Sequence, residues 1–479
     1  MELHKNFIDG QWVEGAEVNR NINPSDTNEV VGEYARADQA QAKEAIAAAR
    51  GALESWKLAT IQQRSDVLDF VGTEILARRE ELGKLLSREE GKTLNEGIGE
   101  TARAGMIFKF FAGEALRPAG EAFPAVRPGV EVEVRREPVG VVGIITPWNF
   151  PIAIPAWKIA PALAFGNSVV FKPADLTPAL GWELAEIISR SGLPAGVFNL
   201  VMGSGSRVGE TIANSPEVGA VTFTGSIPIG RHVRAAAAPR GAKVQLEMGG
   251  KNPLIVLDDA DLDRAAAAAV DGAYFQTGQR CTASSRLVVT DGIHDAFVAA
   301  VSERIKNLRV DNAIKEGTEM GPAVSQDQLD TDLDYLKIGK EEGANLVWGG
   351  EPLERETPGF YLSPALFTET HNDMRINREE IFGPVAAVIR VKDYEEAVEV
   401  ANDTGFGLSS GICTTSLKYA HDFKIRSAAG LVMVNLPTAG IDYHVPFGGR
   451  KDSSYGTREQ GTYAKEFYTN VKTAYIAPG

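Results

Sequence analysis

The sequence contains few cysteines and few histidines. Only 2 Cys and 6 His occur among 479 residues. Two cysteines cannot build a disulfide framework, and residues 1–5 are not a cationic segment followed by an apolar one, so we expect a reducing, cytoplasmic location. The histidines show no HxH, HExxH or Cys-His spacing. We therefore expect no metal site.

Positive charge and long apolar runs are also lacking. Lys and Arg total 49 against 64 Asp and Glu, which gives a net charge of −15. We therefore expect neither nucleic acid nor an acidic membrane surface as a partner. The most apolar stretch, residues 140–157, contains three prolines and an asparagine, so it cannot span a bilayer as one helix. The length and ordinary composition predict about three globular domains.

What the sequence does contain is a repeated strand–helix pattern that begins at residue 139. Short β-branched runs alternate with helical patterns up to Gly250, where the pattern starts again and continues to about residue 435. Continuous apolar strands between helices predict two doubly wound α/β domains with parallel sheets. Residues 131–135 and 467–476 read instead as isolated strands, which we expect to form a small edge sheet that pairs with another subunit.

Cys281 lies on a Gly-containing loop in the segment Gln276-Thr-Gly-Gln-Arg-Cys-Thr282. An exposed thiol there predicts a nucleophile that adds to carbonyl groups. The alternative for any single cysteine is a buried small side chain. Cys413, inside the apolar strand 410–414, fits that alternative, whereas Arg280 and the polar neighbours of Cys281 do not.

Two further polar residues follow buried strands. Glu247 ends the strand 244–247, where a carboxylate suits acid–base chemistry, although a solvated strand-end acid is the alternative. Asn149, in Thr146-Pro-Trp-Asn-Phe-Pro151, follows the strand at residues 141–146. Its amide can donate to a developing oxyanion, or it can simply occupy a Pro-flanked turn.

Several strand ends also suit a dinucleotide. Lys172 and Asp175 end one strand and can hold ribose hydroxyls, or form a solvated charge pair. The glycines of 203–209 come close to GxGxxG without matching it, and Thr224-Gly-Ser226 opens a helix that can face a pyrophosphate. Gly91-Lys-Thr93 resembles the tail of a P-loop, but Leu86 stands where that motif requires glycine. We therefore discard it.

Seven motifs together resemble the series found in the NAD(P)-dependent aldehyde dehydrogenase superfamily. They occur in that family's order and spacing, and the resemblance runs from about Phe7 to the C-terminus. The motifs are Thr146-Pro-Trp-Asn-Phe-Pro151, Phe171-Lys-Pro173, Phe223-Thr-Gly-Ser226, Leu246-Glu-Met-Gly-Gly-Lys-Asn252, Gly278-Gln-Arg-Cys281, Glu380-Ile-Phe-Gly-Pro384 and Pro446-Phe-Gly-Gly449.

The resemblance implies a catalytic set. Cys281 is implied to attack the aldehyde, Asn149 and the Cys281 N–H to hold the oxyanion, and Glu247 to act as the general base. Lys172 belongs to the catalytic set as well as to the cofactor site. Because Glu247 is present, the resemblance implies hydrolysis to a free carboxylate. Members that pass the acyl group to coenzyme A typically lack this glutamate.

The resemblance also implies a cofactor site and a domain plan. The implied cofactor is NAD or NADP, with NAD favoured by Asp175. The implied cofactor residues are Ile145, Thr146, Pro147, Trp148, Lys172, Asp175, Gly205, Gly209, Phe223, Thr224, Gly225, Ser226, Glu380 and Phe382. The implied plan is a dinucleotide-binding domain at 1–119 and 139–249, a catalytic domain at 250–465, and oligomerisation strands at 120–138 and 466–479. The expected assembly is a homodimer or homotetramer.

The substrate is implied to be a small aldehyde. The segments 278–284, 436–443, 448–455 and 458–460 resemble the branch that oxidises 2-oxoglutarate semialdehyde (2,5-dioxopentanoate). A buried substrate carboxylate needs a cation, for which Arg280 is the candidate; the alternative is that Arg280 supports the catalytic loop. Expected substrate-site residues are Phe150, Trp157, Phe275, Arg280 and Phe447.

Other functions stay open at this point. Succinate semialdehyde is the runner-up, weakened because Trp157 and Gln276 stand where its specific enzymes tend to carry arginines. The aromatic pocket also suits an uncharged aliphatic or aromatic aldehyde. A non-enzymatic member and a coenzyme A-acylating enzyme are less favoured, because the nucleophile, the base and the oxyanion amide are all present.

Overall fold

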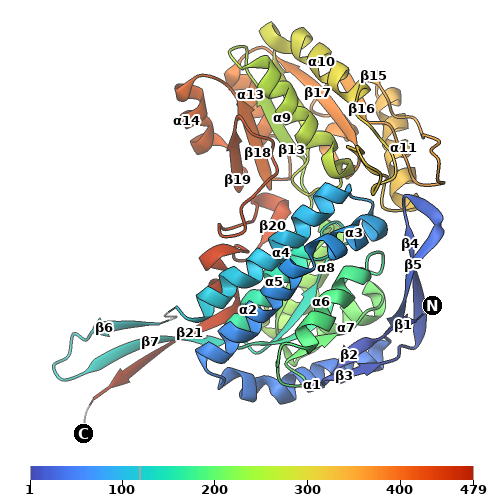
Figure 1. Ribbon diagram of the computed structural model, residues 1–479. Helices are drawn as coiled ribbons and strands as arrows, with labels where there is room; N and C mark the ends of the chain where they lie inside the picture. Colours follow the sequence, from blue (N-terminus) through green and yellow to red (C-terminus); the bar gives the residue numbers. More distant parts are fainter. Residues whose placement is uncertain (1, 118–119, 478–479) are drawn as a thin grey trace.

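The computed structural model describes residues 2–117 and 120–477. Residues 1, 119 and 479, which are end points of the domain ranges predicted above, lie outside the described residues. The described residues form an eight-stranded sheet, a seven-stranded sheet and two three-stranded sheets (Figure 1). The two large sheets occupy the two lobes seen in Figure 1, with the seven-stranded one in the upper lobe. This is the α/β architecture with parallel sheets expected from the strand–helix pattern.

The eight-stranded sheet has the order β20-β12-β11-β8-β9-β10-β2-β3. Its five inner strands are parallel, because they are buried runs joined by helical crossovers. The bounds are β12 (Lys243–Glu247), β11 (Val218–Thr224), β8 (Val141–Ile145), β9 (Ser168–Lys172) and β10 (Phe198–Leu200), with antiparallel edges β20 (Ser454–Tyr455), β2 (Asn6–Ile8) and β3 (Gln11–Val13).

Helices cover this sheet and carry apolar faces toward it. In α1, Asp38 caps the first turn by accepting from the Gln41 N–H at 2.9 Å, and the buried residues recur at helical spacing. The bounds are α1 (Gln39–Lys57), α2 (Ile61–Ala77), α3 (Arg79–Glu90), α4 (Leu94–Ala115), α5 (Ala153–Ala164), α6 (Ala179–Ser189), α7 (Glu210–Asn214) and α8 (Ile227–Ala237).

The seven-stranded sheet has the order β15-β16-β17-β14-β13-β18-β19, and only β15 is antiparallel to its neighbour. The strands are β15 (Asn345–Trp348), β16 (Ala365–Thr370), β17 (Val385–Val391), β14 (Ser284–Thr290), β13 (Asn252–Val256), β18 (Ser409–Cys413) and β19 (Leu431–Val434). The helices are α9 (Leu262–Tyr274), α10 (Asp291–Lys306), α11 (Gln326–Glu341), α12 (Arg375–Arg378), α13 (Tyr394–Asn402), α14 (Leu417–Arg426) and the terminal α15 (Lys465–Tyr468).

The two isolated strands of the sequence do pair with each other. β7 (Glu131–Pro138) lies between β6 (Glu121–Pro124) and β21 (Thr469–Ile476), and all three are antiparallel. They form an arm that projects from the lower lobe in Figure 1. The other three-stranded sheet joins β1 (Leu3–His4), β5 (Asp26–Arg36) and β4 (Glu17–Asn23).

Two details differ from the sequence-based plan. β20 lies inside the range expected for the second domain, yet it extends the first sheet by pairing with β12. The chain therefore returns to the first sheet before the arm. β1, β4, β5 and β15 had no prediction, because their half-exposed or polar residues carry no clear apolar run, and the buried β16 was also not predicted. Among the described residues, no helix is long and apolar enough to cross a membrane.

Candidate active site

Cys281 follows a strained turn between α9 and β14. Gln276 and Thr277 both have left-handed backbone conformations, with φ of 54° and 56°, and Gly278 follows with φ of 67°. Such conformations in non-glycine residues cost about 1 kcal/mol or more each and persist only where the surroundings hold them. The loop that carries the thiol is thus set by its contacts rather than by local preference.

Those contacts come from three separate segments. Each joins a loop residue to a polar atom distant in sequence: Gln276 N–H to Glu96 Oε1 (2.9 Å), Thr277 Oγ1 to the Gly321 carbonyl (3.1 Å), Val324 N–H to Gln279 Oε1 (2.9 Å) and Asn252 Nδ2 to the Cys281 carbonyl (2.8 Å). Gly250 is required beside the last of these, because a Cβ there would lie 2.4 Å from the Cys281 carbonyl oxygen.

The Cys281 thiol rests in its neutral form. Burial raises the pKa of Cys281 to about 12, and the nearby carboxylates of Glu380 and Glu247 act in the same direction. Its own backbone N–H and Arg280 lower this pKa by less. A thiol in this state needs a base before it can attack.

Glu247 is the residue predicted from the sequence to be that base. It ends β12, is buried, and accepts a hydrogen bond from Ser454 Oγ at 2.5 Å. Burial, followed by the neighbouring Glu459 carboxylate, raises the pKa of Glu247 well above its usual range. A carboxylate with a raised pKa takes up a proton near neutral pH more readily than a solvated one.

A buried ion pair lies behind Glu247. Lys158 Nζ pairs with the Glu459 carboxylate and donates to Thr222 Oγ1 at 2.7 Å, and both charged side chains are shielded from solvent. In front, Gly448 has a φ of 145°, and a Cβ there would lie 2.7 Å from Glu247 Oε1. A Cβ on Gly448 would also lie 2.7 Å from Arg458 Nη1, so only glycine leaves room beside the Glu247 carboxylate and this guanidinium.

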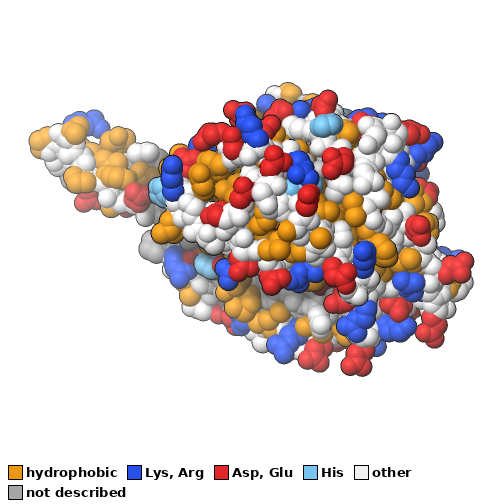
Figure 2. Space-filling model, turned by 90° about the horizontal axis from the view of Figure 1, so that it is seen from above, with side chains coloured by type: hydrophobic (Ala, Val, Ile, Leu, Met, Phe, Trp, Pro, Cys, Tyr) orange, Lys and Arg blue, Asp and Glu red, His pale blue; other side chains and the backbone are white. Residues whose placement is uncertain are grey.

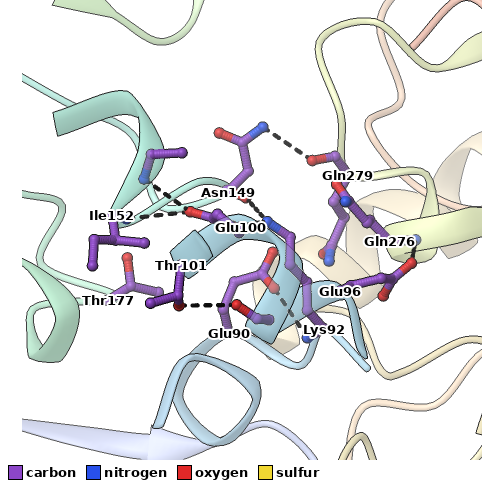
Figure 3. Close-up of polar contacts among 12 residues, drawn as sticks. Glu90, Lys92, Glu96, Glu100, Thr101, Asn149, Ile152, Thr177, Gln276 and Gln279 are labelled. Atoms are coloured by element: carbon purple, nitrogen blue, oxygen red, sulfur yellow. Dashed lines mark hydrogen bonds and ion pairs between the residues drawn. The ribbon is translucent and has the colours of Figure 1, made fainter. Parts of the chain in front are cut away.

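Asn149 is held by a buried polar network that Figure 3 shows. Its Nδ2 donates to the Gln279 carbonyl at 3.0 Å, which ties the amide to the Cys281 loop. The main-chain carbonyl of Asn149 accepts a hydrogen bond from Lys92 Nζ, and Lys92 is paired with Glu100 at 2.6 Å. The second N–H of the Asn149 side-chain amide has no hydrogen-bond partner among the described residues.

Glu100 extends this network to α5. Its Oε1 accepts from the backbone N–H groups of Ile152 and Ala153, at 3.2 and 3.1 Å, at the start of that helix (Figure 3). A carboxylate at a helix N-terminus is favourable because the helix dipole is positive there. Lys92 and Glu100 thus fix the turn that bears Asn149 from both ends.

Sequence reasoning missed Lys92, Glu100, Lys158, Glu459 and Ser454 as parts of the site. Ser454 and Glu459 lie in the segments 448–455 and 458–460, which the resemblance marked without assigning them a role, and Lys92 lies in Gly91-Lys-Thr93, discarded as a P-loop. Gly91 in fact ends α3 in a left-handed conformation with a φ of 96°, and this sharp turn directs Lys92 inward.

The carboxyl ends of four parallel strands bring the predicted cofactor residues together. In the sheet, Ile145 is level with Lys172 and Phe223, and Thr224 is level with Glu247. Gly225 links β11 to β12 by donating to the Glu247 carbonyl at 3.1 Å. Ligands of open α/β sheets bind at this edge.

The polar atoms at this edge fit a dinucleotide. The hydroxyls of Thr146 and Thr224 are buried and have no partner among the described residues. Ser226 caps α8 without a side-chain hydrogen bond to that helix, which leaves its hydroxyl and the helix N-terminus available to a pyrophosphate. Pro147 lies in the bend after Thr146. The π-helical turn Gly205–Gly209 brings Gly209 beside Lys172 and Ile145, whereas a Cβ on Gly205 would meet nothing within 4 Å.

Lys172 and Asp175 are both engaged. Burial lowers the pKa of Lys172, whose Nζ donates to the Pro173 carbonyl at 2.8 Å. Asp175 pairs with Arg36 at 2.9 Å, and its carbonyl accepts from Asn19 Nδ2 at 2.5 Å. The acid expected at the adenosine ribose is therefore partly neutralised by an arginine that sequence reasoning did not identify.

Glu380, Phe382 and Trp148 are the remaining residues predicted to contact the cofactor. Glu380 Oε1 accepts from the Gly250 N–H at 2.7 Å, and burial raises the pKa of Glu380 to about 7. A Cβ on Gly249 would lie 2.1 Å from this carboxylate. Phe382, with a φ of 64°, meets Trp148 edge to face at 5.3 Å between ring centroids.

Three of the four aromatic residues predicted for the substrate pocket lie near one another. Trp157 and Phe447 pack with ring centroids 5.5 Å apart, and Phe150 packs into the same apolar core as Trp157. Lys92 Nζ lies 3.7 Å from the Phe150 ring. Phe275 instead lines a cavity of about 640 Å³ that α9 and α10 border.

Arg280 points toward α9. Its guanidinium donates to the carbonyls of Asp271 and Gly272 (the latter at 3.1 Å) and lies 3.8 Å from the Asp271 carboxylate. These are contacts to the last turn of α9, which precedes the Cys281 loop. The geometry favours the alternative weighed from the sequence, in which Arg280 supports the loop.

Comparison with known proteins identifies the family of the chain. The aldehyde dehydrogenase family model matches residues 12–474. The chain therefore belongs to the aldehyde dehydrogenase family, NAD(P)-dependent oxidoreductases that oxidise aldehydes by way of a cysteine.

Individual relatives cover nearly the whole chain. An alpha-ketoglutaric semialdehyde dehydrogenase from Bacillus subtilis is 45% identical over 99% of this chain and 98% of its own length. An alpha-ketoglutarate semialdehyde dehydrogenase from Haloferax volcanii is 43% identical over 98% of both chains. A crystal structure of betaine aldehyde dehydrogenase from Staphylococcus aureus in complex with NAD+ superposes with a TM-score of 0.96, at 36% identity over 99% of this chain and 94% of that one.

Proposed function

We propose that this enzyme oxidises 2-oxoglutarate semialdehyde to 2-oxoglutarate. The observation that carries the proposal is the joint placement of Cys281, Glu247 and Asn149 around one loop. The names of the Bacillus and Haloferax relatives support the substrate, since both cover the whole length of this chain.

The chemistry of each residue indicates the reaction step in which it acts. Glu247 takes the proton of the Cys281 thiol, and the thiolate adds to the aldehyde carbon to form a thiohemiacetal. Asn149 Nδ2 and the Cys281 backbone N–H stabilise the oxyanion. The bound dinucleotide supplies the hydride acceptor for the oxidation to a thioester.

Glu247 then acts a second time. It removes a proton from a water molecule that attacks the thioester carbon, and the Cys281 sulfur leaves as the carboxylic acid forms. Before this second step Glu247 must release the proton it took from the thiol, and the neighbouring Glu459 carboxylate can accept it. Hydrolysis rather than transfer to coenzyme A follows from this base.

A substrate panel tests the proposal. Purified enzyme with NAD+ is given 2-oxoglutarate, succinate and glutarate semialdehydes and pentanal, and the absorbance of the reduced nicotinamide is followed. We expect the highest kcat/KM for 2-oxoglutarate semialdehyde without added coenzyme A. A higher value for pentanal would contradict an ω-carboxylated substrate, and dependence on coenzyme A would contradict hydrolysis.

We infer that both NAD and NADP are accepted, with NAD preferred. The Asp175 carboxylate disfavours a 2′-phosphate, but Arg36 pairs with it at 2.9 Å and offers a cation to that phosphate. Asp175→Asn should raise kcat/KM for NADP about tenfold, because roughly one unfavourable charge contact is removed. Arg36→Met should lower the value for NADP more than for NAD.

We infer that the arm formed by β6, β7 and β21 pairs with another copy of the chain. Large apolar side chains are exposed on it, and Figure 2 shows them clustered on the projecting segment: Phe123 (48% exposed), Val126, Val471 (59%), Tyr475 (62%) and Ile476. Exposed apolar groups on a projecting sheet are typical of an interface. Light scattering of a Val471→Asp, Tyr475→Asp variant should show a smaller assembly than the dimer or tetramer expected of the native chain.

A further inference from the structure

Three buried N–H donors beside the aromatic pocket have no partner among the described residues. They are Arg103 Nε, Trp157 Nε1 and Gln460 Nε2. The Arg103 guanidinium lies 5.6 Å from the centroid of the Trp157 ring and donates from Nη2 to Gln460 Oε1 at 3.3 Å. Trp157 in turn packs on Phe447. The three donors therefore belong to one cluster.

The orientation of Gln460 follows from this contact. A guanidinium has no acceptor, so the amide oxygen of Gln460 must face Arg103 and its Nε2 must face away. Gln460 is fully buried and has a left-handed backbone, with φ of 60° and ψ of 171°. A strained, buried polar residue with an unused donor is the pattern of a binding site, since strain of this kind is retained where function needs it.

Arg103 is also short of counter-charge. It forms no ion pair within the part of the chain that the structure describes, and Glu100, the nearest buried acid, is already paired with Lys92. Burial lowers the pKa of Arg103, and Glu100 and the exposed Asp442 act against it. A shielded cation without a counter-charge is costly, and an anionic ligand offsets that cost.

We propose that Arg103 binds the distal carboxylate of the substrate, with Gln460 Nε2 and Trp157 Nε1 as further donors to its oxygens. This inference rests on the proposed function, because it names the group that selects an ω-carboxylated aldehyde. It also separates two arginines. Both have an Nε without a partner among the described residues, but Arg280 donates to two carbonyls of α9 and lies beside the Asp271 carboxylate, whereas Arg103 donates only to Gln460.

Kinetics on matched aldehydes test this assignment. Arg103→Met should raise KM for 2-oxoglutarate and glutarate semialdehydes about 10- to 100-fold, the range of one lost charged hydrogen bond, and change KM for pentanal less than about threefold. Arg103→Lys should recover part of the loss. Lys109→Met is the control, since Lys109 pairs with Asp69 on the surface, 2.7 Å away; it should leave all values unchanged.

A second measurement does not depend on turnover. Glutarate should slow alkylation of Cys281 by iodoacetamide in the wild-type enzyme and in Lys109→Met, but not in Arg103→Met. Equal losses on charged and neutral aldehydes, or full glutarate protection in Arg103→Met, would overturn the role of Arg103 while the proposed function stands. If the wild-type enzyme itself did not prefer charged aldehydes, both would fall together.

Discussion

The two cysteines of this chain differ in their neighbours and hardly at all in their pKa. Burial raises the pKa of both thiols to about 12. Cys413 lies inside β18, packed into the apolar core of the seven-stranded sheet. Cys281 has the carboxylates of Glu247 and Glu380, its own backbone N–H and Arg280 around it. Burial alone therefore does not identify a nucleophile; the groups that can take its proton and stabilise its product do.

The backbone around the two thiols differs in the same way. Cys413 is in a regular strand whose hydrogen bonds are satisfied by its neighbours. Cys281 follows a turn with consecutive left-handed residues at Gln276 and Thr277. Contacts from α4, the Asn149 turn and the 321–324 segment hold this strained turn.

The largest expected effect separates the two thiols directly. Cys281→Ala should lower kcat roughly 10⁴-fold or more while NAD+ still binds, because no group remains to form the thioester. Cys413→Ala should keep kcat within about twofold. Steady-state rates with any accepted aldehyde, together with NAD+ titration, check both. If Cys281→Ala kept substantial activity, the comparison above would be wrong.

The next largest effect is expected at Glu247, and it tests whether this carboxylate is what distinguishes Cys281 from Cys413. Glu247→Gln should lower kcat about 10²- to 10⁴-fold, since the amide cannot accept the thiol or water proton. Alkylation of Cys281 by iodoacetamide should slow as well. The alkylation rate of Cys413, measured in unfolded protein, should be the same with and without the substitution. Mass spectrometry of the two cysteine peptides gives both rates.

The pH dependence of the native enzyme follows from the same residue. The base works only when deprotonated, and burial raises the pKa of Glu247 well above that of an ordinary carboxyl group. The value of kcat/KM should therefore fall as the pH drops through this raised pKa, higher than the usual carboxylate range. A profile flat down to the ordinary carboxyl range would contradict it, and Glu247→Gln should lose that limb.

A smaller effect is expected from the network that places Asn149. Lys92→Met removes the donor to the Asn149 carbonyl and should lower kcat about 10- to 100-fold, because a misplacement near 1 Å is enough for such a loss. The buried Glu100 is then unpaired, which should also cost about 3–5 kcal/mol of stability. Lys109→Met, which breaks a surface pair, should cost at most about 1 kcal/mol.

A double variant separates the two consequences. In Lys92→Met, Glu100→Gln the buried charge is removed, so much of the free energy of unfolding should return. The Asn149 carbonyl still lacks its donor, so kcat should stay low. If activity returned together with stability, Lys92 would matter for folding and would have no part in placing the oxyanion amide.

The sequence predicted what local patterns encode. Buried strands such as β8 and β12 were predicted to within one residue of their observed bounds because an apolar β-branched run is a local signal. Cys281, Glu247 and Asn149 could be predicted as site residues because motifs surround them. Lys92 was missed because its partner Asn149 lies 57 residues away, and Arg103 because Gln460 lies 357 residues away. No local pattern marks a contact between such distant positions.

The smallest expected effect is on the free energy of unfolding, and it compares the two cysteines again. Cys413→Ala should lower the free energy of unfolding by about 1–2 kcal/mol, because it leaves a small cavity beside fully buried neighbours in the core. Cys281→Ala should cost less, since Cys281 is only half-buried and its loop is held by backbone and amide contacts rather than by the sulfur. Urea unfolding of both variants, with unchanged slope, gives the two values. A larger loss for Cys281→Ala would mean that its thiol also holds the loop, and the division between a reactive and a packed cysteine would then be one of degree.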